Sequence, residues 1–232
     1  MDPEMALRRA RLTTPRAAAV AGVLFSVLLI TALVLIRVSI PDSGKGSGDW
    51  LSSDWGAITL ALNLVPFAGI AFLWFIGVVR ARLGAYEDQL FSTVFLGSGL
   101  LFLAMLFASS ALAGGIIIAY GGDQAGQGEA GSYAFARAVI FLTMNTYAMR
   151  MAGVFMISTS TIFVRTGVMP RWMALLGYAL ALILLLTITS FSWISLVFPL
   201  WVLMISVYIL IENLGGNGEA LPLPAQRQED PS

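Results

Sequence analysis

Long apolar runs alternate with short polar segments along the whole chain. A helix that crosses a membrane needs about 20 mainly apolar residues, because the hydrocarbon core is roughly 30 Å thick. Six runs approach or exceed this length, and they cover residues 17–36, 56–79, 90–119, 133–164, 172–188 and 194–211. The pattern predicts an all-α polytopic membrane protein, a bundle of six transmembrane helices.

Composition supports the same class. Of 232 residues, 58% are hydrophobic and 11% are charged, whereas soluble domains carry about 25% charged residues. The lipid bilayer is therefore the first partner that the sequence predicts.

Arginines are concentrated in the N-terminal segment and in alternate connections. The cations on this side of the predicted bundle are Arg8, Arg9, Arg11, Arg16, Arg80, Arg82, Arg165 and Arg171. The other connections carry Lys45 and several acids, with Arg37 and Arg137 at the margins of helices. Because basic residues favour the cytoplasmic side, both termini are predicted to be cytoplasmic.

Three parts of the chain follow from this topology. Residues 1–16 form a basic cytoplasmic tail, residues 17–212 the transmembrane domain, and residues 213–232 a second cytoplasmic tail. The last part begins near a Gly-Gly-Asn-Gly sequence and continues with Pro and polar residues, a composition typical of disorder.

The residue types that are missing narrow the possible chemistry. The chain contains no His and no Cys, which are the usual ligands of zinc, haem and iron–sulfur clusters. We therefore expect no metal, no cofactor and no catalytic residues. Four arginines near the N-terminus of a chain with zero net charge do not form the basic domain that nucleic acid binding requires.

Arg150 is the sharpest candidate for function, because it lies near the middle of the run 133–164. A charged residue at that depth costs at least about 2.5–3.5 kcal/mol and usually faces the bundle or a wet cavity. No Asp or Glu lies in any of the six runs, so neutral acceptors, water, a lipid phosphate or an anionic ligand must compensate the charge. We expect Arg150 to face the interior, near Asn63 or the Ser109 and Ser110 pair.

The candidate ligand-binding set also includes Thr146 and Tyr147, which share a helical stripe with Arg150 if 133–164 is one regular helix. Three interpretations remain open at this stage. Arg150 binds an anionic group in a polar cavity, or it ties helices together, or a break near Asn145 moves it toward the outer interface.

Small residues are frequent in the run 90–119. Ala104, Ala108, Gly114 and Gly115 would let another helix approach closely. Packing within the chain is one interpretation of this pattern, and a contact with a second copy or another membrane protein is the other.

Two segments carry a resemblance to a family. Residues 62–80 (LNLVPFAGIAFLWFIGVVR) and 95–107 (FLGSGLLFLAMLF) resemble a family of small, uncharacterised multi-span membrane proteins from high-GC bacteria. The resemblance implies a bacterial plasma membrane, and it supplies neither an activity nor site residues.

Two functions are consistent with these features. The first is a non-catalytic accessory or assembly protein of the membrane. The alternative is a channel or facilitator for a small solute or anion, with Arg150 in a polar cavity.

Overall fold

The structure is a computed structural model that describes residues 3–39, 55–83, 89–120, 130–167, 169–186 and 193–215. The described residues are almost entirely helical, and no strand occurs among them. The predicted all-α class is confirmed.

Each predicted run corresponds to one helix or one continuous helical rod. The elements are α1 (Pro3–Ser39), α3 (Trp55–Leu83), α4 (Gln89–Tyr120), α5 (Ala130–Leu142), the π-helix η1 (Thr143–Ala148), α6 (Met149–Thr166), α7 (Arg171–Leu186), the short 3-10 helix η2 (Ile194–Leu196) and α8 (Val197–Gly215). α5, η1 and α6 follow one another without interruption and form the α5–α6 rod.

Five of these units are long and apolar enough to cross a membrane, and α7 is a shorter apolar helix. The chain therefore has the character of a multi-helix membrane protein. α7 contains 16 residues, which at about 1.5 Å per residue gives a length of about 24 Å.

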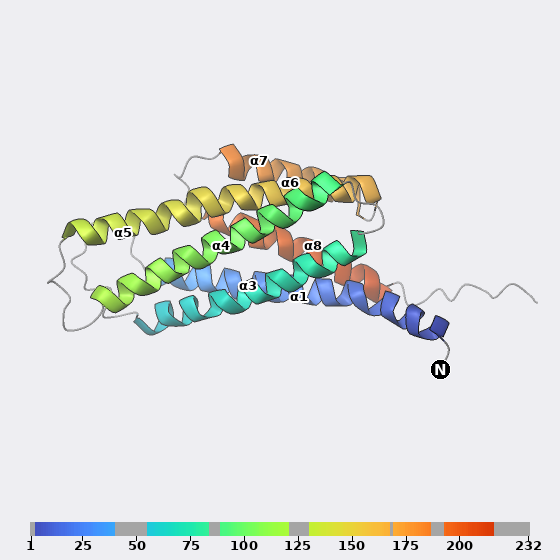
Figure 1. Cartoon of the computed structure of the whole chain (residues 1–232), viewed down its shortest axis with the longest axis horizontal. Coiled ribbons are helices and arrows are strands. Elements are labelled where there is room, and N and C mark those ends of the chain that lie inside the picture. The colour runs from blue at the N-terminus through green and yellow to red at the C-terminus, as the bar shows by residue number, and fades with distance from the viewer. Residues whose placement is uncertain are drawn as a thin grey trace, which may run out of the picture.

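Both ends of the described chain lie at the same end of the bundle, which we call the proximal end (Figure 1). The distal end is the opposite one, where α5 begins. α1 starts at Pro3 and α8 ends at Gly215, so helix extends into both predicted tails. The remainder of the C-terminal tail, 216–232, lies outside the described residues.

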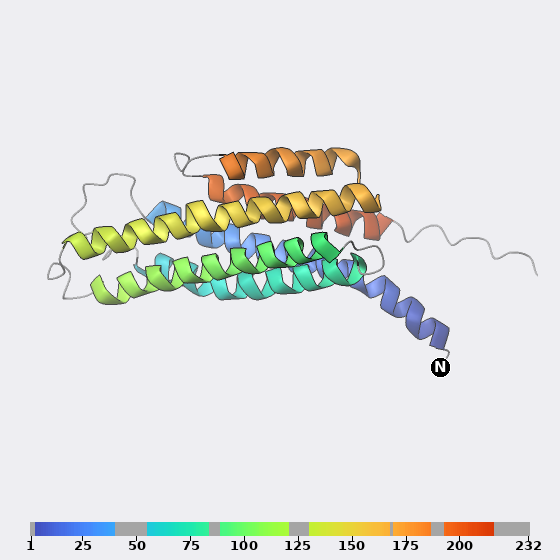
Figure 2. The same cartoon turned by 45° about the horizontal axis from the view of Figure 1, so that its top comes forward.

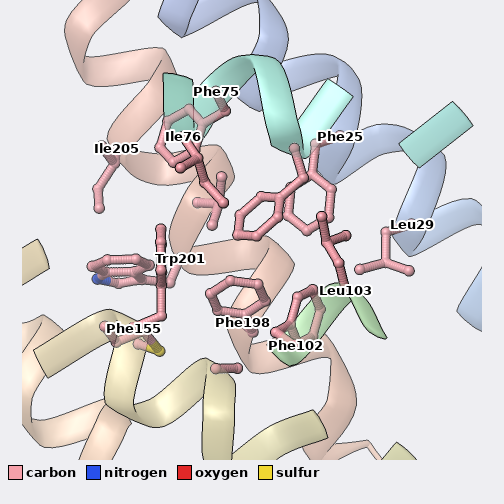
Figure 3. Packing of buried hydrophobic residues seen from close by; sticks show 14 of the residues in the cluster. Phe25, Leu29, Phe75, Ile76, Phe102, Leu103, Phe155, Phe198, Trp201 and Ile205 are labelled. Atoms are coloured by element: carbon pink, nitrogen blue, oxygen red, sulfur yellow. The ribbon is translucent and has the colours of Figure 1, made fainter. Parts of the chain in front are cut away.

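Five phenylalanines from five different helices form the centre of the core, and Figure 3 labels four of them, Phe25, Phe102, Phe155 and Phe198. The five are Phe25 of α1, Phe72 of α3, Phe102 of α4, Phe155 of α6 and Phe198 of α8, and all are fully buried. Their ring centroids lie 4.5–6.4 Å apart in the contacting pairs. Because lipid tails are as apolar as the core, such tight packing, rather than exclusion of water, holds membrane helices together. Each aromatic pair contributes about 0.5–1.5 kcal/mol beyond its area.

α7 lies at the edge of the bundle beside α6 (Figures 1 and 2). The two helices meet through small residues: a Cβ on Gly153 would lie 3.1 Å from Leu185 Cγ and 3.2 Å from the Ala181 carbonyl oxygen. The hydroxyls of Thr161 and Tyr178 are hydrogen-bonded at 2.8 Å. This close seam makes α6 the helix that connects α7 to the rest of the bundle.

Candidate functional site

The segment before Arg150 is a π-helix rather than a break. Thr143–Ala148 forms this wider turn between α5 and α6. The side chain of Asn145 donates to the Phe141 carbonyl at 3.2 Å, a local bond that competes with the regular α-helical pattern. Runs of π-helix are rare and frequently occur at functional sites. The open question about the run 133–164 is answered: it is one continuous rod with an irregular centre.

Arg150 lies on the surface of the single chain, and the prediction that it faces the interior is wrong. Its neighbours Met149 and Ala152 are buried, whereas Arg150 is exposed. The π-helix shifts Thr143 and Thr146 in phase relative to Arg150, so the predicted stripe is not continuous. Within α6, Gly153 is buried against α7, whereas Arg150 is exposed. The centre of the core consists of phenylalanine rings, and a charge buried there without a partner would be strongly destabilising.

The predicted acceptors do not form a pocket around Arg150. Asn63 is exposed on α3. Ser109 donates to the Ile140 carbonyl at 3.3 Å and so connects α4 to α5, and Ser110 donates to the Leu106 carbonyl of its own helix at 2.9 Å. These contacts contradict the expected interior cluster, while ligand binding by any of these residues stays a prediction.

Two further members of the predicted set lie on the π-helix. Tyr147 is 58% exposed, on the surface of the chain like Arg150. The Thr146 hydroxyl oxygen is buried and has no hydrogen-bond partner among the described residues. The surface near the π-helix therefore presents one guanidinium and one phenol.

The depth of Arg150 follows from the aromatic core. At about 1.5 Å per residue, Arg80 lies about 12 Å from Phe72 toward the proximal end, and Arg165 lies about 15 Å from Phe155 in the same direction. Arg37 lies about 18 Å from Phe25 toward the distal end. These charges are separated by about the thickness of a hydrocarbon core. Arg150 lies only about 7–8 Å distal to Phe155, within the distal leaflet and about 10 Å short of the level of Arg37.

Other helices end near the level of Arg150. α7 ends at Leu186 close to the level of Gly153, because Leu185 contacts the position of the Gly153 Cβ. The helical segment of η2 and α8 follows Trp193, which is 49% exposed and lies five residues before Phe198. Exposed Tyr and Trp side chains favour the membrane–water interface, so Tyr147 and Trp193 indicate an interface at this level on the α6–α7–α8 side.

Small residues of α4 are divided between two faces. Ser98 and Gly99 face the core and are buried, whereas Ala104, Ala108, Ala111 and Gly115 are exposed on the opposite face. The exposed four are separated by four, three and four residues, so they form one continuous stripe along the helix. A Cβ on Gly115 would contact nothing within 4 Å.

Gly114, which was grouped with this stripe in the sequence-based prediction, belongs to another face. It is half-buried, and its Cβ position lies 3.9 Å from Leu62 Cδ1 of α3. Leu100, Leu101, Phe107 and Leu112 are exposed on the two sides of the stripe. The outer face of α4 thus carries a stripe of small residues between larger apolar ones, here called the α4 groove.

Three buried polar groups were not identified by sequence reasoning. The hydroxyls of Ser160 and Ser206 and the indole N–H of Trp201 have no hydrogen-bond partner among the described residues. Gly177 of α7 lies against two of them: its Cβ position would overlap the Ser160 hydroxyl and lie 3.1 Å from Trp201 Nε1. No sequence signal distinguishes these hydroxyls from others on apolar helices, most of which donate to a carbonyl one turn earlier.

The chain matches no known protein family, and no curated protein or solved structure matches it. The resemblance to a family from high-GC bacteria stays a prediction.

Proposed function

We propose that this protein is a non-catalytic accessory or assembly protein of a bacterial plasma membrane, and that it assembles with a second copy of itself through the α4 groove. The observation that carries the proposal is the size of the side chains on the exposed face of α4. A face that only meets lipid has no need for four small residues in one stripe, whereas helix association in membranes depends on such residues.

The α4 groove is self-complementary. Its floor accepts side chains from a facing helix, and its sides carry the large exposed residues Leu101 and Leu112 that could fill such a floor. Two copies inserted in the same direction meet around a two-fold axis, so the same residues contact one another. The alternating separations of four and three residues suit a left-handed pair crossing at about 20°.

The alternative function, a facilitator with Arg150 in a polar cavity, is less well supported. It required an inward charge, and Arg150 is exposed. The centre of the bundle, where a pathway would run, contains the five buried phenylalanines of the core.

The experiment is to measure the oligomeric state of purified protein in nanodiscs or mild detergent, with Ala108→Leu as the test variant. Filling the groove should overpack the interface, which typically costs about 1–3 kcal/mol, and the dimer should dissociate while the monomer stays folded. Ala179→Leu is the matched control, because Ala179 is exposed on α7. A wild type that is monomeric at every protein-to-lipid ratio would contradict the proposal, as would an Ala108→Leu variant that dimerises normally.

Orientation is part of the proposal. With both termini cytoplasmic, Gly84→Cys should react with an impermeant thiol reagent only after cells are opened, and Ser47→Cys should react on intact cells. The chain contains no native cysteine, so labelling reports one position at a time. Labelling of Gly84→Cys on intact cells would contradict the proposed orientation and indicate the opposite one.

A further inference from the structure

We propose that Arg150 and Tyr147 form a binding site for the phosphate of a lipid in the leaflet at the distal end of the bundle. The proposal starts from an unpaired charge. Arg150 has no hydrogen bond or ion pair with any residue that the structure describes, and the six apolar runs contain no carboxylate. Arginine keeps its charge in proteins, so an anionic group from outside the chain is the natural partner.

The direction of the side chain points to the distal headgroups. Helical side chains tilt toward the N-terminus of their helix, and the N-terminal end of the α5–α6 rod is the distal one (Figure 1). The guanidinium of Arg150 therefore extends from a backbone about 10 Å below the level of Arg37 toward that level. Long cationic side chains reach headgroups in this way.

The surroundings of Arg150 indicate that lipid headgroups lie near its level on this side of the bundle. In the described part of the chain, α7 ends at Leu186 and η2 begins at Ile194, so the described ends of both segments lie near the level of Arg150. The exposed rings of Tyr147 and Trp193 indicate a lowered interface here. A lipid phosphate at that level is within reach of the guanidinium.

The chemistry of the two side chains suits a phosphodiester. A guanidinium donates two parallel hydrogen bonds to two phosphate oxygens, and a phenol can donate a third. Tyr147 lies three residues before Arg150, near the end of the π-helix, and both side chains are exposed. A lipid is favoured over a carboxylate of a partner helix, because Arg150 lies on α6 and outside the α4 groove. The site does not depend on dimerisation.

The test uses the full chain in mild detergent and counts retained phosphatidylglycerol by native mass spectrometry. We expect the wild type to keep one lipid more tightly than the rest, and Arg150→Met to weaken this binding by about tenfold to a hundredfold, the value of a lost charge-assisted contact. Arg150→Lys should lie between them, because the ammonium keeps the charge but lacks the fork. Arg137→Met is the control: Arg137 is exposed on the same rod, about 20 Å further toward the distal end.

Two competitors identify the ligand. A galactosyl diacylglycerol with the same acyl chains lacks phosphate and should not occupy the site, and millimolar inorganic phosphate should not displace the lipid. Equal binding of the galactolipid, or unchanged binding by Arg150→Met, overturns the proposal. Displacement by inorganic phosphate would assign the site to a free anion instead. Loss of the dimer in Arg150→Met with lipid binding intact would assign Arg150 to a partner's carboxylate and also overturn it. Should Arg150→Met fail to fold, Arg150→Lys and Tyr147→Phe provide the same comparison.

Discussion

The two faces of α4 are both apolar, yet they differ in how large and small side chains are arranged on them. The inner face carries large residues such as Phe95, Phe102 and Leu106, all buried. The outer face carries the stripe of Ala and Gly residues that forms the floor of the α4 groove. In water, hydropathy would separate the two faces, because a surface must be polar. In a membrane, lipid-facing and core-facing residues have the same polarity, so side-chain size becomes the informative property.

The largest effect should come from the inner face. Phe102→Ala removes a ring that contacts Phe25, Phe72 and Phe198, and large-to-small changes of this kind cost about 3–5 kcal/mol. Reversible unfolding in mixed micelles should show this loss. The comparison is Leu101→Ala on the outer face, which should change the unfolding free energy of the monomer by less than about 0.5 kcal/mol. Similar losses for both variants would mean that the two faces are not different environments.

An intermediate effect is expected where small residues already meet a neighbouring helix. Gly177→Leu would place a side chain against the Ser160 hydroxyl and the Trp201 ring, and we expect a loss of about 1–3 kcal/mol from overpacking. Ala179→Leu, on the exposed side of the same helix, should have little effect. The thermal stability of the two variants in detergent tests this difference. An unaffected Gly177→Leu variant would show that the seam between α6 and α7 has room for a larger side chain.

The smallest effect concerns the single hydroxyl pair between α6 and α7. Tyr178→Phe removes the hydrogen bond to Thr161, and bonds of this type between membrane helices contribute about 0.6 kcal/mol on average. The Thr161 hydroxyl keeps its bond to the Ile157 carbonyl at 2.8 Å, which limits the cost. A loss above about 2 kcal/mol would indicate that this pair, rather than the small-residue seam, holds α7 in place.

The helices could be predicted from the sequence, because the thickness of the hydrocarbon core dictates a run length that six segments approach or exceed. Whether Arg150 faces the bundle or the surface could not be predicted. A charge near the middle of an apolar run was expected to face inward, and a regular period was assumed through residues 143–148, where the π-helix shifts Thr143 and Thr146 relative to Arg150. The meeting of Phe25, Phe72 and Phe198 was also unpredictable, since phenylalanines on lipid-facing surfaces, such as Phe67 and Phe135, look the same in sequence.

The same limit applies to the small residues of α4. Sequence reasoning identified Ala104, Ala108 and Gly115 as a possible contact, but it grouped Gly114 with them. Gly114 differs from the exposed stripe because its face of α4 packs against α3, where it lies near Leu62. The sequence does not show which face of α4 meets α3.

Disulfide cross-linking of single cysteine variants in native membranes tests directly whether the α4 groove is the contact between two copies. A two-fold axis along the groove brings the two copies of Ala108 together, and a disulfide requires Cβ atoms about 4 Å apart. We predict that mild oxidation converts Ala108→Cys largely into a covalent dimer and leaves Ala179→Cys monomeric. Equal cross-linking of the two variants, or stronger cross-linking through Ala179→Cys, would contradict the account.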